Sequence, residues 1–172
     1  MNEIIGNYEA FIVNIGPGLR AAGINRSELA MMDHICYRVE TNERYDELLR
    51  TFSGMATLLG VAEVSGRDIA TFEFHNYLDV DGWRVPYLEL PAPKENSPYP
   101  EGLEHAELVV IGGLDRFAKM HSELPFDTKG MGKDINPELG LKTKRLSVKF
   151  HEQPLGAVVR IEERLGRLRH PA

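Results

Sequence analysis

The sequence predicts an α+β fold in which two βαβββ modules follow one another along the chain. The first observation is a degenerate repeat, because the segment 32–39 (MDHICYRV) returns 71 positions later as 103–110 (LEHAELVV). The second is that each copy is followed by a helical pattern and then by extended runs. The third is a proline-rich stretch, 91–100, between the two. We therefore expect a single domain over 1–172, with these parts: an N-terminal helical layer 1–31, modules 32–91 and 103–152, a linker 92–102, and a C-terminal helix 153–172.

The N-terminal layer is predicted from apolar residues at near-helical spacing over residues 3–23. Gly16-Pro17-Gly18 interrupts this pattern. We therefore expect a helix of about three turns, a break, and a shorter helix to Ala22.

The first module begins with a strand at His34. Thr41 and Asn42 can cap a helix whose apolar positions continue to Leu59, before Gly60. Three extended runs follow, at 61–64, 69–74 and 83–90, the last two joined by a turn at 79–82. Pro86 lies inside the last run, so its nitrogen must face away from the ladder or lie at a bulge.

The second module repeats this order in shorter form. A strand at 104–110 precedes a helix from Asp115, and 125–137 has a loop composition in which a second strand would be short. A hairpin is predicted from 138–141 and 146–151. Beyond Pro154 the apolar residues recur at helical spacing to Leu168, which predicts a helix and not a strand.

Both copies of the repeat place an acid and a histidine at the start of a strand. Side chains alternate between the two faces of a strand, so His34 shares a face with Cys36 and Arg38, and His105 shares one with Glu107. One such histidine would be interpreted as a half-buried structural residue. Two at equivalent places in a repeat indicate metal-ligand or acid/base groups brought into one cleft.

Composition narrows the classes of function. A net charge of −6 argues against a nucleic-acid partner, and one cysteine excludes both a disulfide framework and a cysteine-cluster zinc site. The first residues lack the pattern of a signal peptide, and no apolar stretch reaches the length of a membrane span, so we expect no membrane partner and a cytoplasmic location. The basic cluster 160–169 is interpreted as a solvated helix face.

Several short motifs together resemble one family. These are Asp33-His34-Ile35, Gly66-Arg67, Tyr87-Leu88-Glu89-Leu90-Pro91, Glu104-His105-Ala106-Glu107, Asn136-Pro137 and Val148-Lys149-Phe150-His151. In order and spacing they are similar to the YecM family, within the vicinal oxygen chelate superfamily of glyoxalases, epimerases and extradiol dioxygenases. The resemblance covers nearly the whole chain. It implies a glyoxalase-like fold, two modules forming a paired half-barrel, and a divalent-metal site, but no particular reaction.

The resemblance also implies a ligand set. His34 and His105 match the strand-one ligands of the superfamily, and Glu89 matches the carboxylate that ends the first module. The fourth position departs from the superfamily pattern, and alternation along the last strand makes His151 the candidate, with Glu162 in reserve. Such a set suits Zn, Ni, Fe or Mn and leaves room for a substrate's oxygens.

A small-molecule ligand is the expected partner, and a homodimer is left open. The ligand-binding candidates are Arg38, Arg67, Glu107 and Lys149, with a surface ion pair as the alternative for the arginines. No catalytic residue is assigned. Three classes of function remain: a metal-dependent lyase, isomerase or dioxygenase, a non-catalytic module that binds a metal or small ligand, and a structural protein with an empty cleft.

Overall fold

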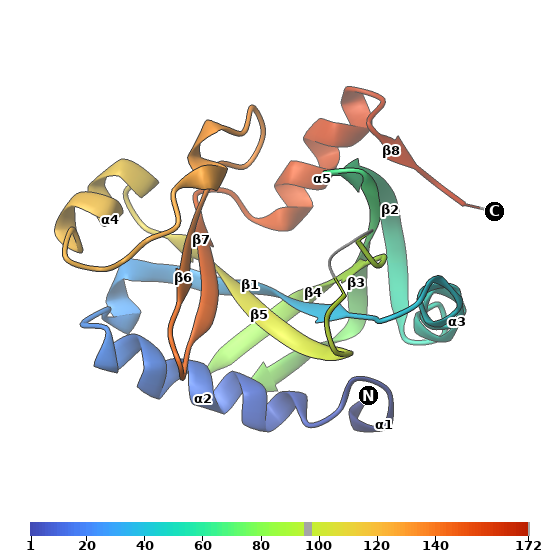
Figure 1. The fold of residues 1–172 in the computed structure, drawn as a ribbon, viewed down its shortest axis with the longest axis horizontal. Coiled ribbons are helices and arrows are strands. Elements are labelled where there is room, and N and C mark those ends of the chain that lie inside the picture. The colour runs from blue at the N-terminus through green and yellow to red at the C-terminus, as the bar shows by residue number, and fades with distance from the viewer. Residues whose placement is uncertain (95–97, 172) are drawn as a thin grey trace.

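A computed structural model, which describes residues 1–94 and 98–171, places both modules in one mixed sheet (Figure 1). Its strand order is β6-β7-β5-β1-β4-β3-β2-β8. The strands are β1 (Leu29–Arg38), β2 (Ala56–Val64), β3 (Arg67–Val80), β4 (Trp83–Pro91), β5 (Gly102–Val110), β6 (Glu138–Lys142), β7 (Ser147–His151) and β8 (Leu168–Arg169). The two modules join where β1 pairs antiparallel with β5, which are the two repeated strands. Within the predicted linker 92–102, residues 95–97 lie outside the described residues.

The first module has the predicted βαβββ order, with α3 (Asn42–Phe52) between β1 and β2. The Thr41 side chain caps α3 by accepting a hydrogen bond from the backbone N–H of Arg44. The expected extension of this helix to Gly60 is wrong. The chain turns at 53–55, and β2 then pairs with β3 from Ala56 onward, so the apolar residues beyond it belong to a strand.

Pro86 lies where the ladders on both sides of β4 are interrupted, as its missing N–H requires. The pairing of β4 with β1 starts at Tyr87, and its pairing with β3 shifts register between Tyr87 and Val85. The three extra residues of β3 at this shift form a bulge in the strand.

The second module is a shortened copy. It contains β5, α4 (Leu114–Met120), the 3-10 turn η2 (Lys129–Gly132), and the hairpin β6–β7. In place of a second strand, this module has one isolated β-bridge between Asp127 and Gly140. The segment 125–137 is therefore free to fold over the sheet beside β6.

The N-terminal layer differs from the expectation. A short α1 (Asn2–Ile5) is followed by a continuous α2 (Tyr8–Ala21), so the break lies at Gly6-Asn7, where the Asn7 side chain caps α2. Pro17 is tolerated inside α2 on its exposed side. Gly18 marks a close approach instead of a break, because a Cβ there would lie 2.9 Å from Leu146 Cδ1.

The predicted C-terminal helix is present as α5 (Leu155–Arg164). It ends before Leu168, which forms the short strand β8 on the edge of β2. Sequence periodicity did not predict this strand. Figure 1 shows α5 and α2 on opposite sides of the sheet. None of the helices in residues 1–94 and 98–171 is long and apolar enough to span a membrane.

The apolar face of the repeated strands forms the core, as alternation predicts. Ile35, Ala106 and Leu108 are fully buried there with residues of α2 and α3. The opposite face, which carries the histidines, lies toward α5. The architecture is therefore a glyoxalase-like α+β fold with one polar concave face.

Candidate metal centre

The two repeated histidines reach one carboxylate. In the β1–β5 ladder His34 lies opposite Glu107, and His105 lies opposite Cys36, so the two imidazoles are diagonal neighbours on the same face. The Nε2 atoms of His34 and His105 lie 3.4 Å and 2.9 Å from Glu107 Oε1. Glu107, predicted only as a ligand-binding residue, is thus the centre of the cluster.

Two further predicted residues border this centre. Glu89 lies on β4 beside Cys36, and its Oε2 is 3.6 Å from His34 Nε2. His151 ends β7, with its Nε2 3.8 Å from Glu107 Oε2 and its ring centroid 5.9 Å from that of His34. His151 is fully buried. The structure therefore brings Glu89 and His151 to either side of His34.

The acid of each acid-histidine pair contacts the following ring. Asp33 Oδ2 lies 3.1 Å from His34 Nδ1, and Glu104 Oε2 lies 2.8 Å from His105 Nδ1. Strict alternation would point Asp33 to the other face, but the ladder shifts register between Met32 and His34. The two copies of the repeat are thus alike in chemistry as well as in sequence, because in each of them a carboxylate orients an imidazole.

His34 and His151 are held with their Nε2 atoms bare. Their Nδ1 atoms lie near Asp33 and the Gln153 carbonyl oxygen, the latter at 2.6 Å. With Nδ1 placed against these acceptors, Nε2 is the ring nitrogen left for a metal ion, which would replace any proton that Nε2 carries in the metal-free chain. Both Nε2 atoms are buried and have no hydrogen-bond partner among the described residues. An orphaned buried nitrogen requires a partner.

His105 differs from the other two. Both of its ring nitrogens lie against carboxylates, so only a doubly protonated ring can donate to both. It groups with Cys36 and Glu104, apart from His34. The predicted role of His105 as a ligand therefore has no free nitrogen in this arrangement. Cys36 is buried, and burial raises the pKa of its thiol, so Cys36 is interpreted as a structural residue and not as a nucleophile.

The buried charges shift one another's proton affinities. Burial alone would lower the pKa of His34, but the carboxylates of Glu107 and Glu89 outweigh it and hold that pKa well above its ordinary value. Burial would raise the pKa of Glu107, but His34 and Lys149 hold it well below its usual range. Glu89 is shifted the same way, against burial, by His34. The cluster thus favours anionic carboxylates next to a cation.

Lys149 supplies such a cation. Its Nζ lies 2.9 Å from Glu107 Oε1 and 3.5 Å from Glu138 Oε1. In the parallel ladder of β5 and β7, Glu107 lies opposite Lys149, just as Cys36 lies opposite Glu89 in the parallel ladder of β1 and β4. Lys149, and not His151, is therefore the structural counterpart of Glu89.

The donor set nevertheless fits a divalent ion. Ligands at about 2.1 Å from a tetrahedral ion lie about 3.4 Å from each other. The separations of His34 Nε2 from Glu107 Oε1 and Glu89 Oε2, 3.4 Å and 3.6 Å, are close to this value. His34, Glu89 and Glu107 form one compact ligand group, and Asp33, His34 and His151 form an adjoining one.

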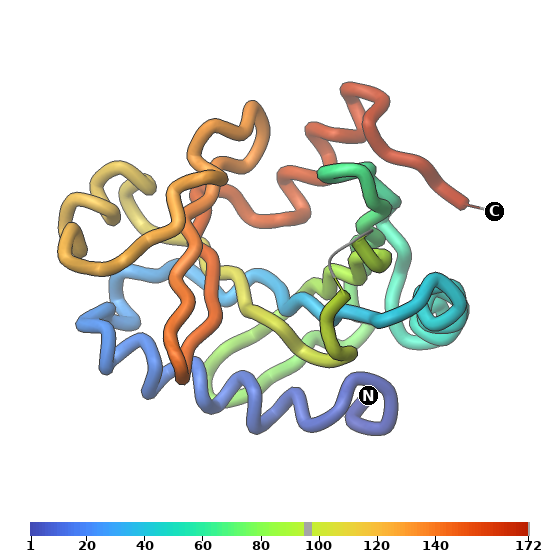
Figure 2. The backbone as a smooth tube through the Cα atoms, in the orientation of Figure 1, coloured from blue at the N-terminus to red at the C-terminus, as the bar shows by residue number. Residues whose placement is uncertain are grey.

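A cavity of about 630 Å³ opens above the carboxylates. Its floor includes Glu89, Glu107 and Lys149, and its walls come from α5 and from the segment 129–138. Figure 2 shows these two walls rising from the same side of the sheet. Glu162 on α5 lines this cavity, and burial together with the charge of Glu89 raises its pKa. The helical period placed Glu162 off the sheet correctly, but it did not reveal that α5 covers the cleft.

Asp33 connects the cleft to α5, a role that sequence reasoning missed. Its Oδ2 accepts a hydrogen bond of 2.8 Å from the backbone N–H of Leu155, the first residue of α5. The repeated acid-histidine dipeptide was the available signal for Asp33. No local pattern could have indicated a contact that spans 122 residues.

The two predicted ligand-binding arginines are separated by the structure. Arg38 is already paired with a carboxylate: its Nε lies 2.6 Å from Glu104 Oε2, and its guanidinium lies over the Tyr99 ring. The ion-pair alternative thus describes Arg38. Arg67 lines the cavity and donates from Nη1 to the Tyr99 hydroxyl at 2.7 Å.

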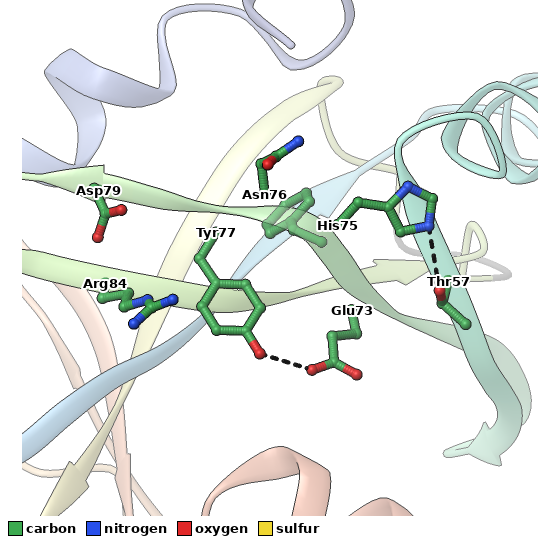
Figure 3. Close-up of a pocket in the computed structure, with 8 residues that line it drawn as sticks. Thr57, Glu73, His75, Asn76, Tyr77, Asp79 and Arg84 are labelled. Carbon is green, nitrogen blue, oxygen red and sulfur yellow. Dashed lines mark hydrogen bonds between the residues drawn. The ribbon is translucent and has the colours of Figure 1, made fainter.

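A second hollow of about 540 Å³ lies at the bulge of β3 (Figure 3). His75 Nε2 lies 3.3 Å from the Thr57 hydroxyl there, and the Tyr77 hydroxyl donates to Glu73. None of the groups of potential metal ligands found in the described residues includes His75. His75 is therefore interpreted as a structural residue.

Comparisons with known proteins agree with this architecture. The chain is 26% identical to Protein YecM of Escherichia coli (strain K12) over 178 residues, 95% of this chain and 94% of the relative. A solved structure described as "Structural Genomics, Protein EC4020" is 28% identical, covers 84% of this chain and 82% of its own, and has a TM-score of 0.70.

The hypothetical protein BH1468 from Bacillus halodurans C-125 is 20% identical, with a TM-score of 0.51 over 71% of this chain and 93% of its own, and shares the fold alone. The family model described as "YecM protein" matches residues 1–162. With the paired modules and their acid-histidine strands, this match shows that the chain belongs to the YecM family.

Proposed function

We propose that the chain binds a divalent metal ion through His34, Glu89 and Glu107, with His151 adjoining, and that the ion takes up oxygens of a small-molecule ligand in the cavity. The observation that carries this proposal is the buried Nε2 of His34, which faces two carboxylates and has no hydrogen-bond partner in the part of the chain that the structure describes. Zn, Ni, Fe and Mn all suit imidazole and carboxylate ligands.

The surroundings of His34 support the proposal. Imidazoles that ligate metals commonly donate their second nitrogen to a carboxylate, which fixes the ring. Asp33 stands in that place, and its own position is fixed by the N-terminus of α5. When bound, the ion would supply a Lewis acid that polarises ligand oxygens, as lyases, isomerases and dioxygenases require. His105, whose Nε2 contacts Glu107, would act as an orienting residue instead of a ligand.

One observation favours a second candidate, a metal-free module that binds a small ligand. Lys149 Nζ and His105 Nε2 both lie 2.9 Å from Glu107 Oε1, so this carboxylate already has an ammonium and an imidazole as partners. In that case the cavity would bind its ligand through side chains alone. A cytoplasmic location and a homodimer stay predictions.

The experiment is metal reconstitution followed by elemental analysis. The purified protein is stripped with a chelator, offered each of the four metals, and desalted. We expect about one ion per chain for the wild type and the loss of that ion in His34→Ala. His75→Ala is the matched control, because His75 lies on β3 in the other hollow. One ion retained in both variants would remove His34 from the ligand set, and no bound ion in the wild type would favour the metal-free module.

A further inference from the structure

We propose that the ligand of this cavity carries an anionic group, a carboxylate in the simplest case, that binds Arg67 at the end of the cavity away from the metal centre. This inference rests on the proposed function for the other end of the ligand. It concerns a site that the metal ligands themselves do not define.

Arg67 is the half-buried cation of the cavity for which no ion pair is found among the described residues, whereas Lys129 and Arg167, which also show none there, are exposed. Lys149 is paired with Glu107, and Lys133 is paired with Glu138 at 2.8 Å. Arg67 contacts only neutral acceptors among the described residues, the Tyr99 hydroxyl at 2.7 Å and the Ala92 carbonyl at 3.4 Å. A guanidinium with donors to spare beside a partly buried cavity attracts a carboxylate, which it can bind through two parallel hydrogen bonds.

The side chain is also held in place before any ligand arrives. The Tyr99 hydroxyl accepts from Arg67 and donates to Ala92 O at 3.2 Å, and the guanidinium of Arg38 lies 4.3 Å from the centre of the Tyr99 ring. These contacts use one nitrogen of Arg67, Nη1, and no hydrogen bond of Nε or Nη2 is found among residues 1–94 and 98–171. Arg67 is thus oriented in advance, which reduces the entropy lost on binding.

Strand β3 sets the distance between the two ends of the ligand. Arg67, Ile69 and Thr71 alternate onto one face of β3 and all line the cavity. Thr71 lies directly opposite Glu89 in the ladder. Four residues along a strand span about 13 Å, part of which the Arg67 side chain can cover.

The cavity also has apolar lining residues. Ile69 lies between Arg67 and Thr71 on β3, and Val158 and Leu155 of α5 line the same cavity. A ligand that fits all three regions has metal-chelating oxygens at one end, a short apolar body, and a carboxylate at the other end. The structure thus favours a substrate class of medium-chain or aromatic acids over neutral carbonyl compounds.

The test has two arms, so that failure of the metal proposal and failure of this one are distinguishable. In the metal-free protein, hexanoate and its uncharged analogue hexanamide are titrated while NMR follows the arginine Nε–Hε signals. We expect hexanoate to shift one signal that is absent in Arg67→Gln, and hexanamide to shift none. Arg145→Gln is the matched control, since Arg145 is exposed on the β6–β7 turn.

In the metal-loaded protein, calorimetry compares hydroxamates that end in a carboxylate with their methyl esters over a series of chain lengths. We expect the acids to bind at least about tenfold more tightly at the best length, and Arg67→Gln to remove this difference. Acids and esters of equal affinity, or a hexanoate response that persists in Arg67→Gln, would overturn the inference. Hydroxamates that do not respond to metal, with hexanoate still reporting on Arg67, would overturn the metal proposal alone.

Discussion

Lys149→Met should increase the affinity of the chain for a divalent metal, because the Lys149 ammonium is paired with the Glu107 carboxylate that the ion would bind. Its Nζ is 2.9 Å from Glu107 Oε1, so an ion at about 2.1 Å from that oxygen would lie no more than about 5 Å from the ammonium. With an effective dielectric constant of about 20, the repulsion between charges of +1 and +2 at this distance is about 7 kcal/mol.

Two features reduce that figure. Lys149 is 30% exposed, so solvent screens part of the repulsion, and Glu138 at 3.5 Å offers the ammonium another partner. We therefore expect a gain of about 1.4 to 3 kcal/mol, which is about 10- to 100-fold in affinity. Methionine keeps the length and apolar stem of lysine, so the gain should come from charge and not from lost packing.

The assay is competition for Zn²⁺ with a chromophoric chelator at pH 7, with thermal unfolding of the metal-free variants as a check on folding. Lys133→Met is the matched control, since it removes a cation from the same cavity that is paired with Glu138 instead of Glu107. That variant should change the affinity less than about threefold. An unchanged or weaker affinity in Lys149→Met would refute the reasoning and favour Lys149 as part of a metal-free ligand site.

Four further outcomes are expected. Glu89→Gln should weaken metal retention about 10- to 100-fold with an unchanged circular dichroism spectrum, because the amide loses only the charge. Asp33→Asn should weaken metal binding about tenfold and lower the free energy of unfolding in urea by about 1–2 kcal/mol, since Asp33 holds both His34 and the start of α5. The raised pKa of His34 stabilises the metal-free fold fully below about pH 6.5, and this stabilisation is lost as pH rises through the folded-state pKa, so His34→Gln should flatten the fall in stability above pH 6.5. Gly156→Ala should cost about 1–3 kcal/mol, because its Cβ would lie 2.3 Å from the Tyr87 hydroxyl, and Tyr87→Phe should recover part of that loss on thermal melting.

Period-two alternation and the repeat predicted most of the fold and the polar face. They placed His34 and Glu107 on one surface although 73 residues separate them, as the β1–β5 ladder shows. Helix ends were less predictable: Leu59 and Leu168 continue helical periods in sequence but belong to strands. Tertiary pairing decides such positions, and a local pattern does not contain it.

The site was predictable in residue type but not in its pairing. The sequence indicated His34, Glu89 and His151, which lie together, and His105, whose nitrogens are both taken by carboxylates. It could not show that Lys149 neutralises Glu107, because their contact depends on the register between β5 and β7. A shift of that register by one residue would turn Lys149 to the other face.

The registers also bear on how a duplicated module would give one centre of the proposed kind instead of two. Cys36 and Glu107 are equivalent positions of the repeat, 71 residues apart. Glu89 on β4 lies opposite Cys36, and Lys149 on β7 lies opposite Glu107. Each module thus offers one carboxylate, from β4 in the first and from β5 in the second. A glutamate at 149 would add another buried anion with no counterion until metal arrived, whereas Lys149 balances Glu107 at once. The metal-free chain can therefore fold with the proposed ligands already in position, and on the proposed function metal uptake would be an exchange of one cation for another at Glu107.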